Sequence, residues 1–360
     1  MNWKEVSKEF PALSNCTYLN SATFGQVARR TQAAVAAHFA RRDRYASADF
    51  LDWFDDMDEI RGLVGKLINC DGSDVAFVTN ASTALSLFLG GIEWKTGDRI
   101  ATLPDEFPNQ IYYGGWLGGR GVELVECPGM ETLPARTRAI VISSVNYANG
   151  YRPDLARVAR LAREAGALLY IDGTQSQGAL QFDVQAIQPD MYAVDGYKWL
   201  LTPNGATFFY IAPALRRMIA PAVIGWRSDK GWRSVDELNH GAPEFAEGAE
   251  RYEGGMLNFP SLYGMAEAVR MQLELGPANV EHRVLELARL AADMLRSTGA
   301  QICNEKTNIV AAHWPDRDAS HLARELRKKN IIVAARHGNL RVSPHFYNTE
   351  EDLEALRRAL

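Results

Sequence analysis

The sequence of 360 residues is poor in cysteine and contains no long apolar segment. Its cysteines lie far apart and form no CxxC pair, which favours reduced thiols over a disulfide framework. They are Cys16, Cys70, Cys127 and Cys303. No stretch approaches the unbroken apolar length that crosses a bilayer, and residues 1–16 lack an apolar core of signal-peptide length. These absences predict a soluble, cytoplasmic protein with no membrane partner.

Concentrated basic charge and metal-binding spacings are missing as well. The net charge is -5 and no extended run of Lys and Arg occurs, so the sequence predicts no nucleic-acid partner. The seven histidines are scattered, without an HExxH motif or paired Cys and His residues, which argues against a metal site. No GxGxxG turn follows an early strand pattern, and this absence argues against a Rossmann NAD enzyme.

The sequence does contain a regular alternation of short apolar runs and amphipathic segments. Hydrophobic residues make up 47% and charged residues 23%, which is an ordinary globular balance. Near-continuous apolar strands separated by helices indicate a largely parallel sheet buried on both faces, and so an α/β fold. The runs are VAFVT from Val75, RIATL from Arg99, VELVEC from Val122, AIVISSV from Ala139, ALLYID from Ala167 and ATFFYI from Ala206.

One of the amphipathic segments carries clear helix boundaries. In PDLARVARLAREAG, Pro153 suits the first turn of a helix and Gly166 suits its end. The sequence therefore predicts a helix between these two residues, linking two of the apolar runs.

The alternation of apolar runs and amphipathic segments changes after about Ile211, which indicates a second domain. A long helix is expected over 277–297, and Thr349 and Asp352 have the spacing of a capping box that opens a last helix. These segments read as a smaller α+β domain. The predicted divisions are a large domain over 15–255, a small C-terminal domain over 256–360, and residues 1–14 packed on the small domain.

Polar residues lie where predicted strands end, which is where open α/β sheets bind ligands. After VAFVT, the segment from Asn80 begins a helix that carries Ser82 and Thr83 in its first turn. Two hydroxyls at a helix N-terminus favour a phosphate cradle, because free backbone N–H groups and the helix dipole both attract anions. An ordinary N-cap is the alternative.

An aspartate follows the run ALLYID directly. Asp172 must find a partner there, because an unpaired buried charge is costly. A protonated pyridine nitrogen would serve, and would keep such a ring an electron sink. Gln175 stands three residues on, within reach of a ring hydroxyl. A helix-capping aspartate is the alternative.

A single lysine stands among aromatic and apolar neighbours. Lys198 is flanked by Tyr197, Trp199 and Leu200, which predicts a partly desolvated amine with a lowered pKa, suited to imine chemistry. A snorkelling surface lysine is the alternative. The lysine lies 26 residues after Asp172, a spacing that places the two residues at adjacent strand ends.

An aromatic residue follows the run RIATL. Phe107, in DEFPNQIYY, would lie where a flat ring can stack on the face of a cofactor. Core packing is the alternative for an isolated phenylalanine.

Taken together, these residues resemble the class V aminotransferase family, the fold-type I pyridoxal-phosphate (PLP) enzymes that include cysteine desulfurases and kynureninases. The resemblance runs from YLNSATFG near Tyr18 to RVSPHFYNTEEDL near the C-terminus. It implies PLP as the cofactor and a mainly parallel seven-stranded sheet in the large domain. It also implies a homodimer and a small amino acid as the substrate.

The resemblance also implies roles for individual residues. Lys198 would hold the cofactor as a Schiff base, Asp172 would pair with its pyridine nitrogen, and Arg341 would clamp the substrate carboxylate, for which an arginine fork is well suited. The cofactor-binding residues implied are Ser82, Thr83, Phe107, Asp172, Gln175, Tyr197, Lys198, Trp226 and Asn258.

Local details favour one branch of the family and depart from others. Phe107, the segment around Tyr147, and the segments around Trp226 and Asn258 look closer to kynureninases than to desulfurases. Met256 stands where many class V members carry a threonine that reaches the partner subunit's phosphate site. No cysteine lies near the C-terminal arginine, which argues against a persulfide mechanism.

The predicted function is a PLP-dependent aminotransferase or lyase acting on the α-amino group or Cα of a small amino acid through Lys198. One alternative is a kynureninase-like hydrolase that cleaves a carbon–carbon bond within the side chain of its substrate. Another is a catalytically silent binding protein with the same fold, against which the intact Asp172, Lys198 and Arg341 argue.

Overall fold

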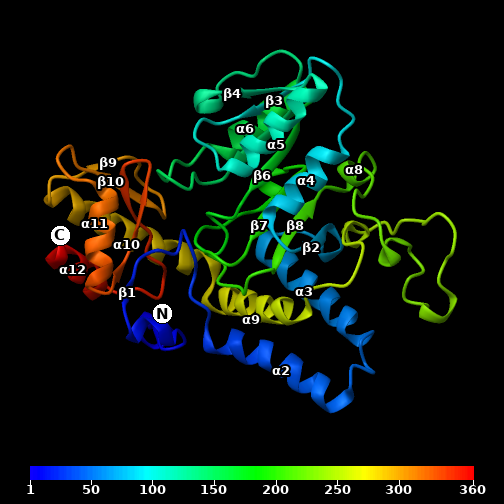
Figure 1. Ribbon diagram of the computed structural model, residues 1–360, viewed down its shortest axis with the longest axis horizontal. Coiled ribbons are helices and arrows are strands. Elements are labelled where there is room, and N and C mark those ends of the chain that lie inside the picture. Colours follow the sequence, from blue (N-terminus) through cyan, green and yellow to red (C-terminus); the bar gives the residue numbers. More distant parts are fainter.

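The computed structural model describes all 360 residues and places a seven-stranded sheet at the centre of the molecule (Figure 1). The strand order is β2-β8-β7-β6-β5-β3-β4, and only β8 runs antiparallel to its neighbours. The strands are β2 (Val75–Val78), β3 (Arg99–Thr102), β4 (Glu123–Glu126), β5 (Thr137–Ser143), β6 (Leu168–Asp172), β7 (Met191–Asp195) and β8 (Thr207–Ile211). This sheet confirms the predicted α/β class.

Each of the six apolar runs forms one of these strands, but the runs do not account for β7 (Met191–Asp195). This strand lies in the middle of the sheet between β6 and β8, and its first four residues are buried. The sequence analysis therefore missed β7, although this strand is buried like the strands on either side of it.

Helices cover both faces of the sheet and give each face its own hydrophobic core. On one face α3 and α9 contribute Trp53, Phe54 and Phe259, which pack with Tyr192 of the sheet. On the other face, Phe88 of α4 packs with the buried side chains that the strands present to that face. The helices are α1 (Trp3–Ser7), α2 (Arg29–Tyr45), α3 (Asp52–Ile68), α4 (Ala81–Gly91), α5 (Pro108–Leu117), α6 (Leu155–Ala165), α7 (Val184–Ile187), α8 (Pro213–Arg216), α9 (Phe259–Leu275), α10 (Pro277–Ser297), α11 (Ala319–Lys328) and α12 (Glu350–Ala359).

The start of α6 differs from the sequence expectation. Asp154, not Pro153, borders the helix, because its side chain accepts a hydrogen bond of 3.0 Å from the backbone N–H of Arg157. Pro153 lies one residue outside this N-cap. Gly166 ends the helix as predicted, with a positive φ of 64° that favours glycine.

The C-terminal elements gather on one side of the molecule, beside α1 and the N-terminus (Figure 1). They form an antiparallel sheet in the order β12-β13-β10-β9, covered by α10, α11 and α12. Its strands are β9 (Gln301–Ile302), β10 (Val310–His313), β12 (Ala334–Arg336) and β13 (Asn339–Val342). The capping box of Thr349 and Asp352 is present at the start of α12, as predicted.

The N-terminal residues meet this C-terminal part of the chain. Strand β1 (Thr17–Tyr18) pairs in parallel with β11 (Ile331–Ile332). The rings of Trp3 and Phe10 each lie 5.8 Å, centroid to centroid, from the ring of Phe346. These contacts tie the first residues to the segment that follows β13.

The division of the chain at residue 255 stays a prediction. Helix α9, which follows that position, runs beside α2 (Figure 1) and its Phe259 and Met265 belong to the core beneath the large sheet. We propose that the boundary between the domains lies at Gly276, between α9 and α10.

None of the helices combines the length and apolar character that a membrane span requires.

Candidate active site

Lys198 lies just beyond the end of β7, beside the end of β6. Asp172 is the last residue of β6 and pairs in register with Ala193 of β7. The lysine follows Asp195, the last residue of β7, by three positions. The two adjacent strand ends thus bring Asp172 and Lys198 to the same edge of the sheet, as their spacing predicts.

The amine of Lys198 is almost enclosed. Its Nζ lies 5.6 Å from the ring centroid of Phe107 and 5.6 Å from that of Tyr197. Burial lowers the pKa of this amine, Asp172 opposes the shift and Arg341 adds to it, so that the pKa is about 8. A pKa close to neutrality lets the amine lose its proton at low cost, which a nucleophilic or proton-transferring lysine requires.

Asp172 is 7% exposed and forms no ion pair with any lysine or arginine. Its Oδ1 accepts a hydrogen bond of 2.8 Å from the backbone N–H of Thr174. Its Oδ2 has only a long contact of 3.5 Å with Nε2 of Gln110. One oxygen of a buried carboxylate therefore still lacks a strong partner, and it belongs to a pocket that Lys198 also lines.

Gln175 lines the same pocket, but its amide is already held from two sides. Its Nε2 donates to the carbonyl of Ala22 at 3.0 Å, and its Oε1 accepts from the indole of Trp199 at 2.9 Å. The second N–H of this amide and one lone pair of its oxygen remain for a ligand. The contacts fix the side chain between the N-terminal segment and the lysine loop.

Phe107 and Tyr147 also line this pocket. Their rings meet edge to face with centroids 5.2 Å apart, and Phe107 is 37% exposed. The Tyr147 hydroxyl lies 3.0 Å from Nε2 of His337. Phe107 is therefore not a core residue, which was the alternative that its sequence left open.

Arg341 is 1% exposed and has no carboxylate partner. Its guanidinium donates to the carbonyl of Tyr147 and to the hydroxyl of Thr23, each at 2.6 Å, while its Nε has no acceptor. Burial lowers the pKa of Arg341 to about 9. A buried cation held only by neutral groups is costly, and a bound carboxylate would remove that cost.

The first turn of α4 borders two cavities. Ala81 faces the Lys198 pocket, whereas Thr83 lines a second cavity. Asn80 is the N-cap, and its Oδ1 accepts from the backbone N–H of Thr83 at 2.9 Å and from its hydroxyl at 3.1 Å. Ser82 is exposed and has no side-chain hydrogen bond. The ordinary N-cap is thus present, and it leaves the Ser82 hydroxyl free.

Trp226 and Asn258 do not reach the Lys198 pocket within one chain. Trp226 packs on Trp232, with ring centroids 5.6 Å apart. Asn258 donates to the carbonyl of Gly205 at 3.3 Å and lines the second cavity together with Met256 and Thr83. Of the predicted cofactor-binding residues, Thr83 and Asn258 therefore line the second cavity, Ser82 and Trp226 line neither cavity, and the others line the Lys198 pocket.

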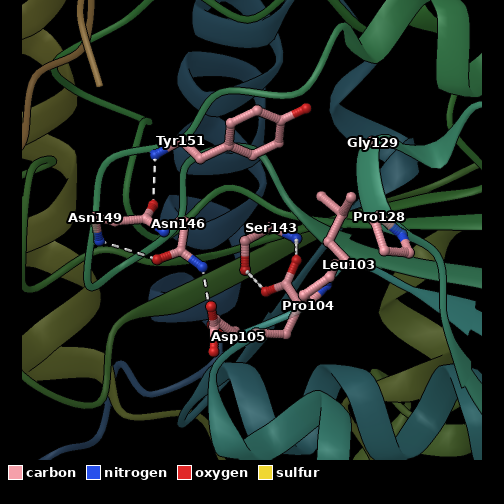
Figure 2. A pocket seen from close by; sticks show the side chains of 10 residues that line it. Leu103, Pro104, Asp105, Pro128, Gly129, Ser143, Asn146, Asn149 and Tyr151 are labelled. Carbon is pink, nitrogen blue, oxygen red and sulfur yellow. Dashed lines mark hydrogen bonds between the residues drawn. The ribbon is translucent and has the colours of Figure 1, made fainter. Parts of the chain in front are cut away.

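Glu106, Ser143 and Gln110 belong to the site and were not predicted from the sequence. Glu106 is 6% exposed and accepts hydrogen bonds from the backbone N–H and the hydroxyl of Ser143, at 2.7 Å and 2.5 Å. Figure 2 shows these bonds beside a cavity that Ser143 and Asn146 also line. Gln110 completes the set, because its Nε2 lies 3.2 Å from the Ser143 hydroxyl as well as near Asp172.

Asp195 is a fourth unpredicted residue, and it lines the Lys198 pocket. The hydroxyl of Thr207 donates to its Oδ1 at 2.7 Å. Burial raises the pKa of this carboxyl. Its position at the end of a strand is the same signal that marked Asp172, but the strand itself had escaped the apolar pattern.

Proteins of similar sequence are known. Residues 20–356 match the family model described as Aminotransferase class-V. The uncharacterized aminotransferase YcbU of Bacillus subtilis is 26% identical, over 96% of this chain and 93% of its own length. Isopenicillin N epimerase of Streptomyces clavuligerus is 28% identical, over 84% of this chain and 83% of its own. A probable cysteine desulfurase of Methanothermobacter thermautotrophicus is 22% identical, over 100% and 98%.

Solved structures share the fold. A mutant of C-DES with glycine covalently linked to its PLP cofactor superposes with a TM-score of 0.90 and 20% identity, covering 98% of this chain and 97% of the other. The cysteine desulfurase CsdA of Escherichia coli superposes with a TM-score of 0.88 and 22% identity, covering 100% and 97%. These likenesses confirm the expected fold-type I architecture.

Proposed function

Because this chain belongs to the aminotransferase class V family, whose members are PLP-dependent enzymes, we propose that it holds PLP on Lys198 and transforms a small amino acid at its α-amino group or Cα. The single observation that carries the proposal is the enclosed Lys198 amine, with a pKa near neutrality, in one pocket with Asp172. Such a pairing of a desolvated lysine and a buried acid suits this chemistry.

The groups around Lys198 fit a flat, protonated pyridine ring. Asp172 offers a buried oxygen with only one long contact, which a ring N–H would satisfy. Phe107 presents its exposed ring at the pocket, suited to cover one face of a cofactor. The free hydroxyl of Ser82 and the N-terminus of α4 suit a phosphate group. The donor set thus matches the cofactor that the family uses.

When bound, PLP supplies an electron sink for the charge that develops at the substrate's Cα. Arg341 is suited to hold the α-carboxylate through its paired N–H groups, which fixes the direction of the amino group. The Lys198 amine, with its pKa of about 8, is suited to take a proton from Cα and to return one. Asp172 favours the protonated state of a pyridine nitrogen.

The names of the relatives favour an aminotransferase or a lyase. They include an uncharacterized aminotransferase, an isopenicillin N epimerase and a probable cysteine desulfurase. A persulfide mechanism does not fit, because the loop before Arg341 carries no cysteine. No contact in the structure favours the kynureninase-like alternative or the silent binding protein.

A substrate screen tests this proposal directly. Purified protein loaded with PLP is titrated with the proteinogenic amino acids and the absorbance of the bound cofactor is recorded. Pyruvate, ammonia, sulfide and anthranilate are then assayed as products. Spectral shifts with turnover of at least one amino acid support the proposal. A protein that binds PLP and responds to none of them would favour the silent binding protein.

We also propose that the protein is a homodimer and works in the cytoplasm. Apolar side chains are exposed beside the second cavity, where Val223 is 47%, Ile224 60% and Met256 58% exposed. A second copy would cover them and bring further groups to the phosphate end of the site. Light scattering after gel filtration measures the oligomeric state. The four cysteines, none of them in a disulfide, suit a reducing compartment.

A further inference from the structure

Two arginines project from one face of the hairpin that β12 and β13 form. Arg341 is paired in register with Ala334, and Arg336 with Asn339. Side chains alternate along a strand, so Arg336, two residues from Ala334, shares the face of Arg341. The two arginines are therefore diagonal neighbours, with Cβ atoms about 7–8 Å apart or less.

The turn between the strands fixes this register. His337 and Gly338 form a two-residue connection, and both have positive φ angles, of 47° and 77°. Such a turn matches the twist of the strands it joins. The spacing of the arginines is thus set by the backbone rather than by flexible side chains alone.

Neither arginine has an anionic partner in the protein. Arg341 donates to the neutral oxygens of Tyr147, Thr23 and Asn20, and Arg336 donates only to the carbonyl of Ala335, at 2.7 Å. No ion pair includes either of them. Two like charges on one face of a hairpin repel each other, and an anion bound between them would remove that repulsion.

The two arginines lie near the Lys198 pocket without lining it. Burial lowers the pKa of the Lys198 amine first, and both Arg341 and Arg336 lower it further, because their charges are near it. Tyr147 lines the pocket and joins it to the hairpin from two sides. Its carbonyl accepts from Arg341, and its hydroxyl meets His337 at the turn. The hairpin therefore packs against Tyr147, one of the residues that line the pocket.

We propose that Arg336 is a specificity-determining residue, and that the substrate is an amino acid whose side chain carries a second acidic group. This inference rests on the proposed function, in which Arg341 takes the α-carboxylate. Arg336 then binds the side-chain anion, and the diagonal spacing suits a four- or five-carbon dicarboxylate. A monoanionic substrate would leave one of the two cations beside the pocket without an anionic partner.

Binding of unreactive acids tests the inference without turnover. Acetate, propionate, succinate and glutarate are titrated by calorimetry into the wild type, Arg336→Ala, Arg336→Lys and, as a control, Arg324→Ala. Arg324 is exposed on α11 and forms no side-chain bond. We expect the wild type and the control to bind dicarboxylates about tenfold tighter than monocarboxylates, since a charge-assisted hydrogen bond favours binding by that order.

The variants separate the two arginines. Arg336→Ala should abolish the preference for dicarboxylates and leave acetate binding unchanged, while Arg336→Lys, which keeps the charge, should retain part of it. Equal affinity of the wild type for both classes would overturn the inference. An equal loss of affinity for acetate and succinate in Arg336→Ala would also overturn it, because Arg336 would then bind the α-carboxylate.

Failure of the proposed function has a different signature. Calorimetry needs no chromophore, so the dicarboxylate preference is measured whether or not the protein holds PLP. A preparation that binds no PLP contradicts the proposed function and still reports on the two arginines.

Discussion

Glu106 accepts two hydrogen bonds from Ser143, and Ser143 is the residue of β5 that pairs in register with Asp172 of β6. Glu106, in the loop after β3, and Asp172, at the end of β6, thus both lie next to Ser143 at the end of β5. Burial raises the pKa of the Glu106 carboxyl to about 7, the two bonds from Ser143 oppose the rise, and Asp172 adds to it. Near neutral pH, Glu106 therefore changes its charge within reach of the proposed cofactor site.

This pKa predicts a pH-dependent loss of stability. An acid whose pKa rises on folding, here from 4.5 to about 7, binds more protons in the folded than in the unfolded state between those values. Stability that Glu106 contributes is therefore present below pH 4.5 and is lost as the pH rises toward 7. Glu106→Gln keeps an acceptor for the Ser143 N–H and carries no charge. We expect it to be more stable than the wild type at pH 8, by ~1–3 kcal/mol, but not at pH 4.5.

Thermal unfolding at pH 4.5, 6, 7 and 8 measures the effect. Glu93→Gln is the control, because Glu93 is exposed and forms no side-chain bond. Curves of Tm against pH that stay parallel for Glu106→Gln and the wild type would show that the carboxyl is not the cause.

Asp172→Asn separates cofactor binding from catalysis. Asparagine keeps an Oδ1 that accepts from the Thr174 N–H, so the local fold is retained. Its amide group has no charge to stabilise a protonated pyridine nitrogen. We expect PLP to remain bound while kcat falls by about 100-fold or more, the usual scale for losing a charge at the reacting group. The amino acid that responds in the substrate screen serves as the assay. Turnover within a few-fold of the wild type would remove Asp172 from the proposed mechanism.

Met256→Thr should tighten PLP binding. Met256 is 58% exposed at the second cavity, in the position where many class V members place a threonine. A hydroxyl there would donate to the phosphate in the proposed dimer, and a hydrogen bond to a charged group lowers the Kd by about tenfold. Met256→Val has the shape of threonine without its hydroxyl and is the matched control. Equal PLP affinity of the Thr and Val variants, measured by fluorescence titration, would contradict the predicted contact.

The sequence predicts most of the large sheet because its buried strands are continuous apolar runs. The exception is β7 (Met191–Asp195), whose apolar residues Met191–Val194 stand between Asp190 and Asp195. The sequence analysis also misplaced the start of α6. Pro153 and Asp154 both suit a helix start, and a side chain that accepts a backbone hydrogen bond is the one that defines the N-cap.

A residue of the site could be predicted only where its neighbours in the sequence mark it. Lys198 and Asp172 stand out because a charged side chain beside apolar neighbours needs a partner. The sequence around Glu106 and Gln110 does not mark them, because their place in the site depends on hydrogen bonds with Ser143, more than 30 positions away in the chain. The pairing of Arg336 with Arg341 likewise depends on the register of a hairpin, which neither residue reveals alone.

The most direct test of the account is to identify the residue that holds the cofactor. Protein loaded with PLP is reduced with borohydride, digested, and its peptides are mapped by mass spectrometry, with Lys198→Ala treated in parallel. The account predicts that the phosphopyridoxyl mass falls on the peptide containing Lys198 and is absent from the variant. A label on another lysine, or an unchanged label in Lys198→Ala, would contradict it.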